Sequence, residues 1–247
     1  MSAAFRLGIQ SYTFRTYRAF PDLVDALTQC ELSFVEIWPG HLSARHGRDD
    51  KRAAAALLAQ NGITMDAYGQ VVFKGDEGAD REAMEFASEC GIAAITADID
   101  PEAYDTTQKL CDEYDINLAL HNHGRNHRYG TVEQLRQAFS RTGPRVGLCL
   151  DTGWLIDAGG DPLEALDEFG DRLYGVHLKD FAYDGNNVNR QDVIIGTGGL
   201  DLPAFMQKLN AMDYDGYLSI EYEGDADNPI PNMKKCVAAA REAISAV

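Results

Sequence analysis

Residues 145–180 of the chain read RVGLCLDTGWLIDAGGDPLEALDEFGDRLYGVHLKD. This stretch contains two apolar runs, at 146–150 and 173–176, and each is followed at once by a residue that can bind a metal ion, Asp151 or His177. Between the runs, Asp-Pro at 161–162 opens a segment whose apolar residues recur at helical spacing. The stretch therefore predicts a strand, a helix and a parallel strand, with a reactive side chain at the carboxyl end of both strands.

The rest of the chain repeats this alternation. Apolar runs typical of strands occur at 7–11, 34–38, 63–69, 92–99, 116–124, 146–150, 173–176 and 215–224, and helical patterns follow them. Eight such units in 247 residues predict a single (β/α)8 TIM barrel domain over residues 1–247, since a barrel of this kind takes about 250 residues. An open doubly wound sheet is the alternative, but no GxGxxG follows the first strand. A long polar loop is expected at 180–201 and a capping box at Thr131 and Gln134.

Composition limits the cellular setting and the partners. No run approaches the roughly 20 apolar residues that a membrane helix needs, and the amino terminus MSAAFRLGIQ lacks the apolar core of a signal peptide. We therefore expect a cytoplasmic protein that does not bind membranes. The five cysteines lie far apart without a CxxC pair, which favours reduced, mostly buried thiols.

The formal net charge of -17 disfavours nucleic acid and anionic membranes as partners, because both are polyanions. An acidic surface with few lysines resembles that of proteins from salt-loving archaea. A merely acidic enzyme explains the composition equally well. The sequence does not decide between these two interpretations, and it leaves a homo-oligomer open.

The chemistry-bearing residues gather after the last four predicted strands. They are His121 and His123, Asp151, His177, and Glu221 with Glu223. Imidazole nitrogens and carboxylate oxygens suit a divalent ion such as Mn, Co, Mg or Zn. The alternative interpretations are Asp151 as a helix cap, His177 as a satisfied core histidine, His121 and His123 as hydrogen-bonded residues in the barrel mouth, and Glu221 as a solvated strand end.

Several motifs resemble the sugar phosphate isomerase/epimerase group of the xylose-isomerase-like TIM barrels, which includes tagatose epimerases and inosose dehydratases. They are HNHG, GLCLDTGW, AGGDP, DRLYGVHLKD, GTGGLDLPAF and YDGYLSIEYEGD, with LGIQSYTF and VEIWPGHL nearer the amino terminus. The resemblance implies a metal ion bound by one residue from each of strands five to eight, here His121, Asp151, His177 and Glu221, with His123 as the other choice on strand five. Epimerases of the group usually carry glutamate where this chain has His121. The group often has histidine where this chain has Trp154.

The resemblance and the strand positions together suggest roles for individual residues. Glu221 is the leading candidate for a ligand that also moves a proton, and His123 is a second catalytic candidate. Lys179 shares the strand parity of His177 and would stabilise an oxyanion or protonate a leaving hydroxyl. The expected substrate contacts are Glu36, His41, Trp154 and Arg190.

We therefore predict a divalent-metal-dependent isomerase or epimerase of a sugar or keto-sugar, phosphorylated or not, which abstracts a proton next to a carbonyl that the ion polarises. The alternative is a metal-dependent dehydratase or lyase acting on an inosose or 3-keto-sugar. The missing strand-five glutamate favours it, because elimination needs one base and one acid. An endonuclease IV-like DNA repair enzyme and a non-catalytic sugar-binding barrel are less favoured.

Overall fold

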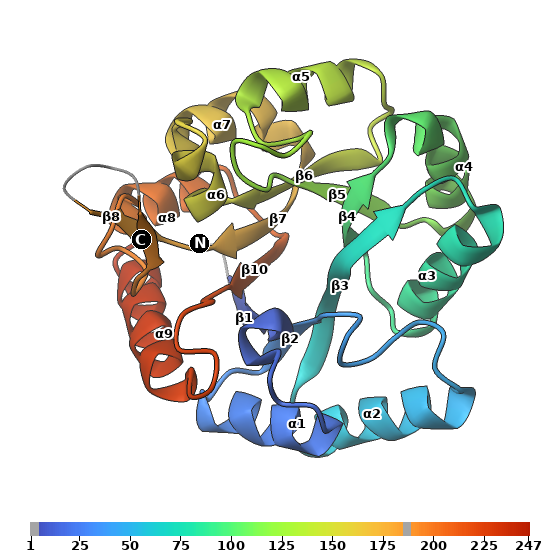
Figure 1. Cartoon of the computed structure of the whole chain (residues 1–247), viewed down its shortest axis with the longest axis horizontal. Coiled ribbons are helices and arrows are strands. Elements are labelled where there is room, and N and C mark those ends of the chain that lie inside the picture. Colours follow the sequence, from blue (N-terminus) through green and yellow to red (C-terminus); the bar gives the residue numbers. More distant parts are fainter. Residues whose placement is uncertain (1–4, 185–188) are drawn as a thin grey trace.

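The fold is a closed barrel of eight parallel strands surrounded by helices, seen along its axis in the computed structural model of Figure 1. The structure describes residues 5–184 and 189–247. The barrel strands are β1 (Arg6–Gln10), β2 (Phe34–Ile37), β3 (Thr64–Phe73), β4 (Ala94–Ile99), β5 (Asn117–His121), β6 (Val146–Asp151), β7 (Leu173–Leu178) and β10 (Tyr217–Ile220). Their order around the barrel follows the chain, and β1 pairs with both β2 and β10 to close it. The predicted TIM barrel is thus confirmed.

Helices cover the outside of the barrel because each returns the chain to the start of the next parallel strand. They are α1 (Phe20–Gln29), α2 (Arg48–Gln60), α3 (Glu77–Glu89), α4 (Tyr104–Tyr114), α5 (Val132–Ser140), α6 (Thr152–Asp157), α7 (Pro162–Phe169), α8 (Leu202–Ala211) and α9 (Ile230–Ser245), with short 3-10 turns at Ser11–Phe14, Pro101–Ala103 and Gly170–Arg172. The predicted capping box at Thr131 and Gln134 is present at the start of α5. Two helices, α6 and α7, separate β6 from β7 where one was predicted.

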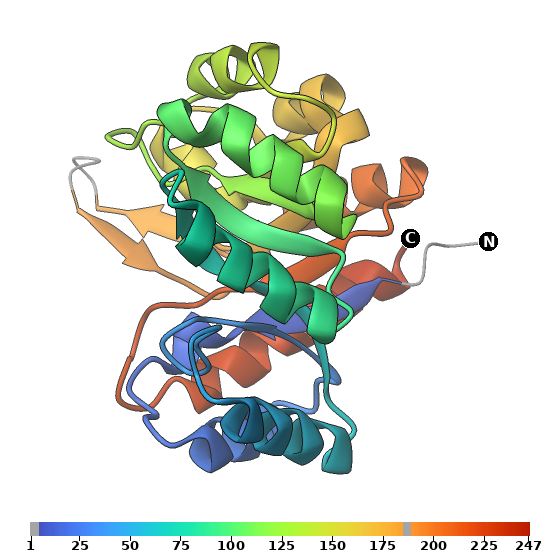
Figure 2. The same cartoon turned by 90° about the vertical axis from the view of Figure 1, so that its right-hand side faces the viewer.

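A small antiparallel hairpin stands beside the barrel. Its strands β8 (Phe181–Tyr183) and β9 (Arg190–Asp192) lie inside the segment predicted to be a long polar loop, so that prediction is wrong in part. Strand β8 is Phe-Ala-Tyr with a buried Phe181, strand β9 is Arg-Gln-Asp, and the two strands pair through their backbones. It projects from the end of the molecule opposite the two termini, as Figure 2 shows.

The inside of the barrel is filled unevenly. Small buried side chains from four strands (Ala67, Ala94, Ala119 and Cys149) pack with Tyr217 from β10. The Tyr217 ring also lies over Gly175 of β7, where a Cβ would come within 2.0 Å of the ring. The small residues thus leave room for one large polar aromatic side chain in the barrel interior.

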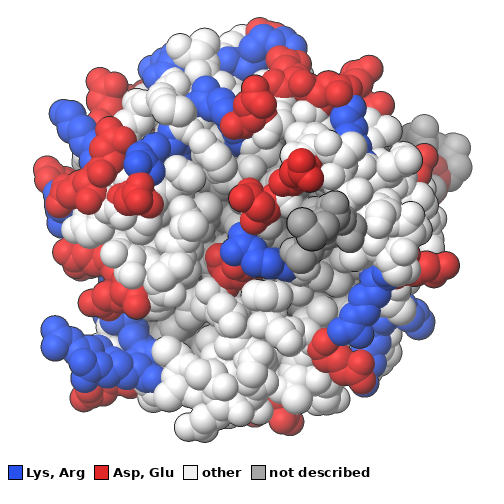
Figure 3. All heavy atoms as spheres, turned by 180° about the vertical axis from the view of Figure 1, so that it is seen from behind, with Lys and Arg blue, Asp and Glu red and all other residues white. Residues whose placement is uncertain are grey.

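Ion pairs connect neighbouring helices on the outer surface. Arg136 of α5 pairs with Glu168 of α7 at 2.7 Å, and Lys208 of α8 pairs with Asp167 of α7 at 2.5 Å. On the face shown in Figure 3, basic and acidic side chains lie interspersed around the rim. Exposed pairs of this kind each contribute about 1 kcal/mol or less to stability.

The cysteines and the helices agree with two expectations from the sequence. All five cysteines are free in this structure, and four of them are buried, as expected for most of them. Within residues 5–184 and 189–247, no helix is both long and apolar enough to cross a lipid bilayer.

Candidate metal centre

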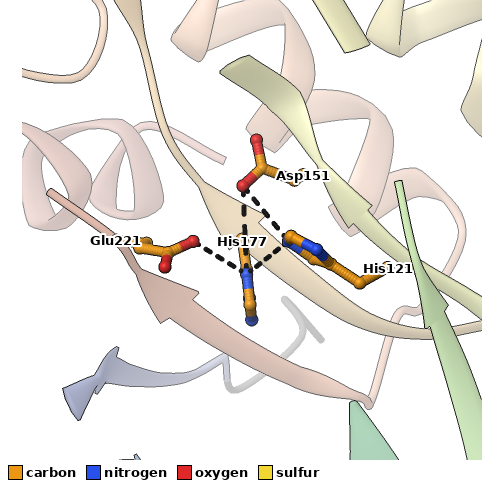
Figure 4. A group of neighbouring side chains, drawn as sticks. All are labelled: His121, Asp151, His177 and Glu221. Atoms are coloured by element: carbon orange, nitrogen blue, oxygen red, sulfur yellow. Dashed lines mark hydrogen bonds and ion pairs between the residues drawn. The ribbon is translucent and has the colours of Figure 1, made fainter. Parts of the chain in front are cut away.

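Four side chains converge at the carboxyl ends of neighbouring strands, as Figure 4 shows. They are His121 from β5, Asp151 from β6, His177 from β7 and Glu221 just after β10. His177 Nδ1 lies 3.2 Å from His121 Nε2 and 3.1 Å from Glu221 Oε2. Asp151 Oδ2 lies 3.4 Å from His121 Nε2. All four residues are buried, so the structure brings together the four predicted ligands.

The helix-cap interpretation of Asp151 is confirmed, and the ligand interpretation stays a prediction, because one carboxylate oxygen caps a helix while the other has no hydrogen-bond partner in the described part of the chain. Oδ1 accepts a hydrogen bond from Trp154 N at 2.7 Å and caps α6. Oδ2 is buried and accepts no hydrogen bond from the described part of the chain. The Asn122 side chain holds the Asp151 backbone through two hydrogen bonds of 2.8 Å. The cap and this clamp fix the carboxylate so that Oδ2 faces the cluster.

These donors fit a divalent ion. One ligand atom from each of the four residues lies within 4.8 Å of the others. Ligands about 2.0–2.2 Å from one ion lie up to roughly 4.4 Å apart, so a shift of a few tenths of an ångström closes the site. Burial raises the pKa of Asp151 to about 7. A bound cation would return that carboxylate to its ionised form and occupy the unpartnered Oδ2.

Lys179 lies next to this cluster and contacts two glutamates. Its side chain is buried, and Nζ is 3.5 Å from Glu221 Oε2 and in closer contact with Glu223 Oε1. Burial would lower the pKa of Lys179, yet Glu221 and Glu223 raise it above its ordinary value. Burial opposes ionisation of Glu221, but Lys179 and His177 outweigh it and hold the pKa of Glu221 well below its usual range. The lysine is therefore a fixed cation between two carboxylates.

A pocket of about 230 Å³ opens beside the cluster. It is lined by Gln10, Tyr12, Trp38, Gln70, His121, His123, Trp154, His177, Glu221 and Glu223. The predicted residues His123 and Trp154 both belong to this lining, and their rings make an edge contact with centres 4.7 Å apart. Burial and the neighbouring His121 lower the pKa of His123 to about 4, so its imidazole is neutral near pH 7.

Two predicted substrate contacts lie one layer behind the pocket. Glu36 is 1% exposed and contacts His177 Nε2 at 2.8 Å. His41 is 8% exposed, contacts Ser11 Oγ at 3.0 Å and Phe14 O at 3.1 Å, and its ring packs edge-on against Trp38. Neither lines the pocket. Glu36 and His41 are therefore placed to hold His177 and Trp38 in position, and not to contact a substrate directly.

Arg190, on strand β9, lies at the edge of this site. Its guanidinium carbon is 4.0 Å from the centre of a Trp154 ring, and Nη1 is 3.6 Å from Asp157 Oδ1. The side chain is 41% exposed. Arg190 therefore packs on an aromatic wall of the pocket and is not itself part of the pocket lining.

Four pocket residues were not predicted: Gln10, Tyr12, Trp38 and Gln70. Gln10 and Trp38 lie at or near the ends of the first two predicted runs, and Tyr12 directly follows the first run, which is a signal that sequence reasoning can use. Gln70 directly follows the third predicted run at 63–69 and so carries the same signal, although in the structure β3 continues past it to Phe73.

An eight-stranded parallel barrel with a buried His/Asp/His/Glu cluster at the carboxyl ends of its strands defines a TIM barrel with a candidate metal centre. The model of the xylose isomerase-like TIM barrel family matches residues 24–243, and the chain belongs to this family.

Known proteins are similar over part or all of the chain. The rhizopine catabolism protein MocC of Rhizobium meliloti is 31% identical over 136 residues, which are 48% of this chain and 40% of that protein. The inosose dehydratase of Geobacillus kaustophilus is 31% identical over 134 residues, or 47% and 42% of the two chains. The matches thus span less than half the length of these relatives. The solved structure of the IOLI protein with a zinc atom has a TM-score of 0.75 at 18% identity, covering 98% of this chain and 99% of that one, and shares the fold.

Proposed function

We propose that the protein is a divalent-metal-dependent enzyme that removes a proton from the carbon next to the carbonyl of a small keto-polyol. The observation that carries this proposal is the buried cluster of His121, Asp151, His177 and Glu221 beside a polar pocket with aromatic walls. When bound there, a divalent ion supplies a Lewis acid that polarises a substrate carbonyl. Manganese, cobalt, magnesium and zinc all suit this donor set.

The size and the charge of the pocket favour a small substrate without a negative charge. Sites for drug-sized ligands measure roughly 300–1,000 Å³, whereas this pocket measures about 230 Å³ and suits a single sugar ring. The described residues that line it include two glutamates and no lysine or arginine. A phosphate group would lie against carboxylates there. Trp38 and Trp154 offer apolar faces to the ring of a sugar, while Gln10 and Gln70 offer hydrogen bonds to its hydroxyls.

Two residues that line the pocket, His123 and Glu221, are the candidates for moving the proton. His123 lines the pocket and is neutral near pH 7, but its lowered pKa of about 4 makes its imidazole a weak base, so it is the second candidate for moving the proton. Glu221 is ionised and lines the same pocket, and it remains a candidate for both ligand and base. Lys179 acts indirectly in this proposal, because it holds the carboxylates of Glu221 and Glu223 in place.

Two reactions can follow proton removal. In a dehydration, the proton leaves the carbon next to the carbonyl and a hydroxyl leaves the following carbon, so that a double bond and one water form. In an isomerisation or epimerisation, a proton returns to carbon and no water is lost. Two points favour dehydration: His121 stands where epimerases of the resembling group usually carry a glutamate base, and the curated relatives include inosose dehydratases.

Solvent-isotope exchange tests the proposal. Purified protein supplemented with each divalent ion is incubated in D2O with inososes, keto-sugars and sugar phosphates, and the products are identified by NMR and mass spectrometry. Loss of water supports a dehydratase, and deuterium incorporation without loss of water supports an isomerase or epimerase. Glu221→Gln is expected to abolish either activity. A protein that binds an ion yet neither exchanges nor converts any of these compounds would contradict the proposal and favour a sugar-binding barrel.

A further inference from the structure

A chain of buried polar contacts leads from His177 into the barrel interior, away from the pocket. His177 Nε2 lies 2.8 Å from Glu36 Oε2. The other Glu36 oxygen, Oε1, accepts a hydrogen bond from Thr96 Oγ1, which in turn lies 2.5 Å from the Tyr217 hydroxyl. All four residues are at most 2% exposed. Glu36 therefore has two well-defined partners and no access to solvent.

These partners set the direction of the hydrogen bond to His177. A carboxylate only accepts hydrogen bonds, so Nε2 of His177 must carry the proton that points at Glu36. In the neutral ring, the lone pair is then on Nδ1. Nδ1 is the nitrogen that faces Glu221 at 3.1 Å and Asp151 at 3.9 Å. Figure 4 shows one ring nitrogen of His177 directed at the other three residues and the second directed away from them.

We infer that Glu36 is a positioning residue: it fixes His177 in the Nε2-protonated tautomer and thereby presents the Nδ1 lone pair to a divalent ion. This inference rests on the metal centre of the proposed function. A carboxylate behind a ligating imidazole fixes the ring and makes the ligating nitrogen more basic. Burying a carboxylate away from water is unfavourable unless it is hydrogen-bonded. The contact between Glu36 of β2 and His177 of β7 supplies such a hydrogen bond, and the positioning role explains why a carboxylate is found there.

A structural role alone makes a different prediction. If Glu36 only filled and cross-linked the barrel interior, its removal would lower stability and leave the affinity for the ion unchanged. Asp80 provides a matched control for this difference. It is a buried carboxylate, 3% exposed, whose oxygens accept hydrogen bonds from the backbone of Lys74 and Gly75.

The experiment measures zinc affinity and the histidine tautomer in Glu36→Gln, Glu36→Ala and Asp80→Asn. Dissociation constants come from competition with a chromophoric chelator, and the tautomer comes from long-range proton–nitrogen NMR of 15N-histidine-labelled, zinc-loaded protein. We expect roughly 10–100-fold weaker zinc binding in Glu36→Ala and a smaller loss in Glu36→Gln, whose amide oxygen still accepts a hydrogen bond. The Nε2–H signal of His177 should exchange faster with water in both. Asp80→Asn should keep the wild-type affinity and tautomer.

The outcomes separate this inference from the proposed function. Unchanged zinc affinity and an unchanged His177 signal in a folded Glu36 variant overturn the positioning role and leave the metal centre standing. Failure of the wild-type protein to bind any divalent ion overturns the metal centre, and the inference falls with it. Circular dichroism checks that each variant folds. If Glu36→Ala does not fold, the nearly isosteric Glu36→Gln decides the question.

Discussion

Lys179 Nζ lies 3.5 Å from Glu221 Oε2, so a buried ammonium adjoins a carboxylate of the candidate metal centre. The lysine side chain is 1% exposed and the glutamate side chain 8% exposed. Because little water reaches either charge, Lys179 stabilises the Glu221 carboxylate, and Glu221 and Glu223 together stabilise the ammonium.

Lys179→Met should therefore destabilise the ion-free protein strongly. Breaking a buried ion pair by removing one partner costs about 3–5 kcal/mol, because the remaining charge stays buried. Urea unfolding in the presence of a chelator measures this loss. Lys208→Met is the matched control, because its partner Asp167 has a 72% exposed side chain and such pairs contribute about 1 kcal/mol or less. Equal losses in the two variants would contradict a special role for the Lys179 pair.

The barrel and the four converging residues could be predicted because each strand, and each candidate ligand at its end, is visible in a short stretch of sequence. Each barrel strand is a short apolar run, and a parallel barrel brings all strand ends to one face. Asp151 and His177 directly follow or end such runs, so their proximity follows once the topology is known. The roles of these residues as ligands stay a prediction that the metal-binding experiments test.

The layer behind the pocket was not predictable, because it depends on contacts across the barrel. Glu36 and His177 are separated by 141 positions in the sequence, and nothing near either residue indicates their contact. His41 supports Trp38 through a turn whose path the sequence does not show. The hairpin with Arg190 was missed because its strands have only 3 residues each and β9 contains no apolar residue.

Arg190→Met tests whether this arginine contacts an anionic group of the substrate. Its guanidinium already packs on Trp154 and adjoins Asp157, and a cation–π contact of this kind contributes about 0.5–1 kcal/mol. We expect KM to rise roughly two- to five-fold, equally for a neutral keto-polyol and its phosphate. Arg141→Met, which removes a similar stack on Tyr104, should leave KM unchanged. A much larger effect on the phosphorylated compound would indicate direct contact with phosphate.

The Asp157 carboxylate connects α6 to Arg125 and to Tyr183 of β8. These contacts should make the free energy of unfolding depend on pH. Arg125 donates hydrogen bonds of 3.2 and 3.1 Å to the two Asp157 oxygens, and Tyr183 donates one of 3.1 Å. Burial raises the pKa of Asp157, but these hydrogen bonds outweigh it and leave the pKa below its ordinary value.

Because this pKa is depressed in the folded state, the stabilisation is present above the unfolded pKa of about 3.9 and is lost as the pH falls through the lower folded value. Asp157→Asn should thus cost on the order of 1 kcal/mol at pH 7 and little near pH 2. Unfolding free energies of both proteins across this range measure the difference. Asp25→Asn, at an exposed position of α1, should show no such trend. A pH-independent cost at Asp157 would contradict the ionised contact.

Asp151→Asn separates the capping role of this residue from metal binding. Asparagine caps a helix about as well as aspartate, so the start of α6 should survive the change. The amide cannot replace Oδ2 as an anionic ligand. At a zinc concentration 100 times its dissociation constant, the wild-type protein should gain about 2.7 kcal/mol of stability, and Asp151→Asn should lose most of that gain.

Asp161→Asn is the matched control for that comparison, because Asp161 caps α7 through a 2.7 Å hydrogen bond to Leu163 N and lies outside the four-residue cluster. It should keep the full zinc-dependent gain, and a chelator should reverse the gain in both the control and the wild-type protein. Thermal unfolding with and without zinc measures all three proteins. If Asp151→Asn gains as much stability from zinc as Asp161→Asn does, the ion binds elsewhere and Asp151 serves only as a helix cap.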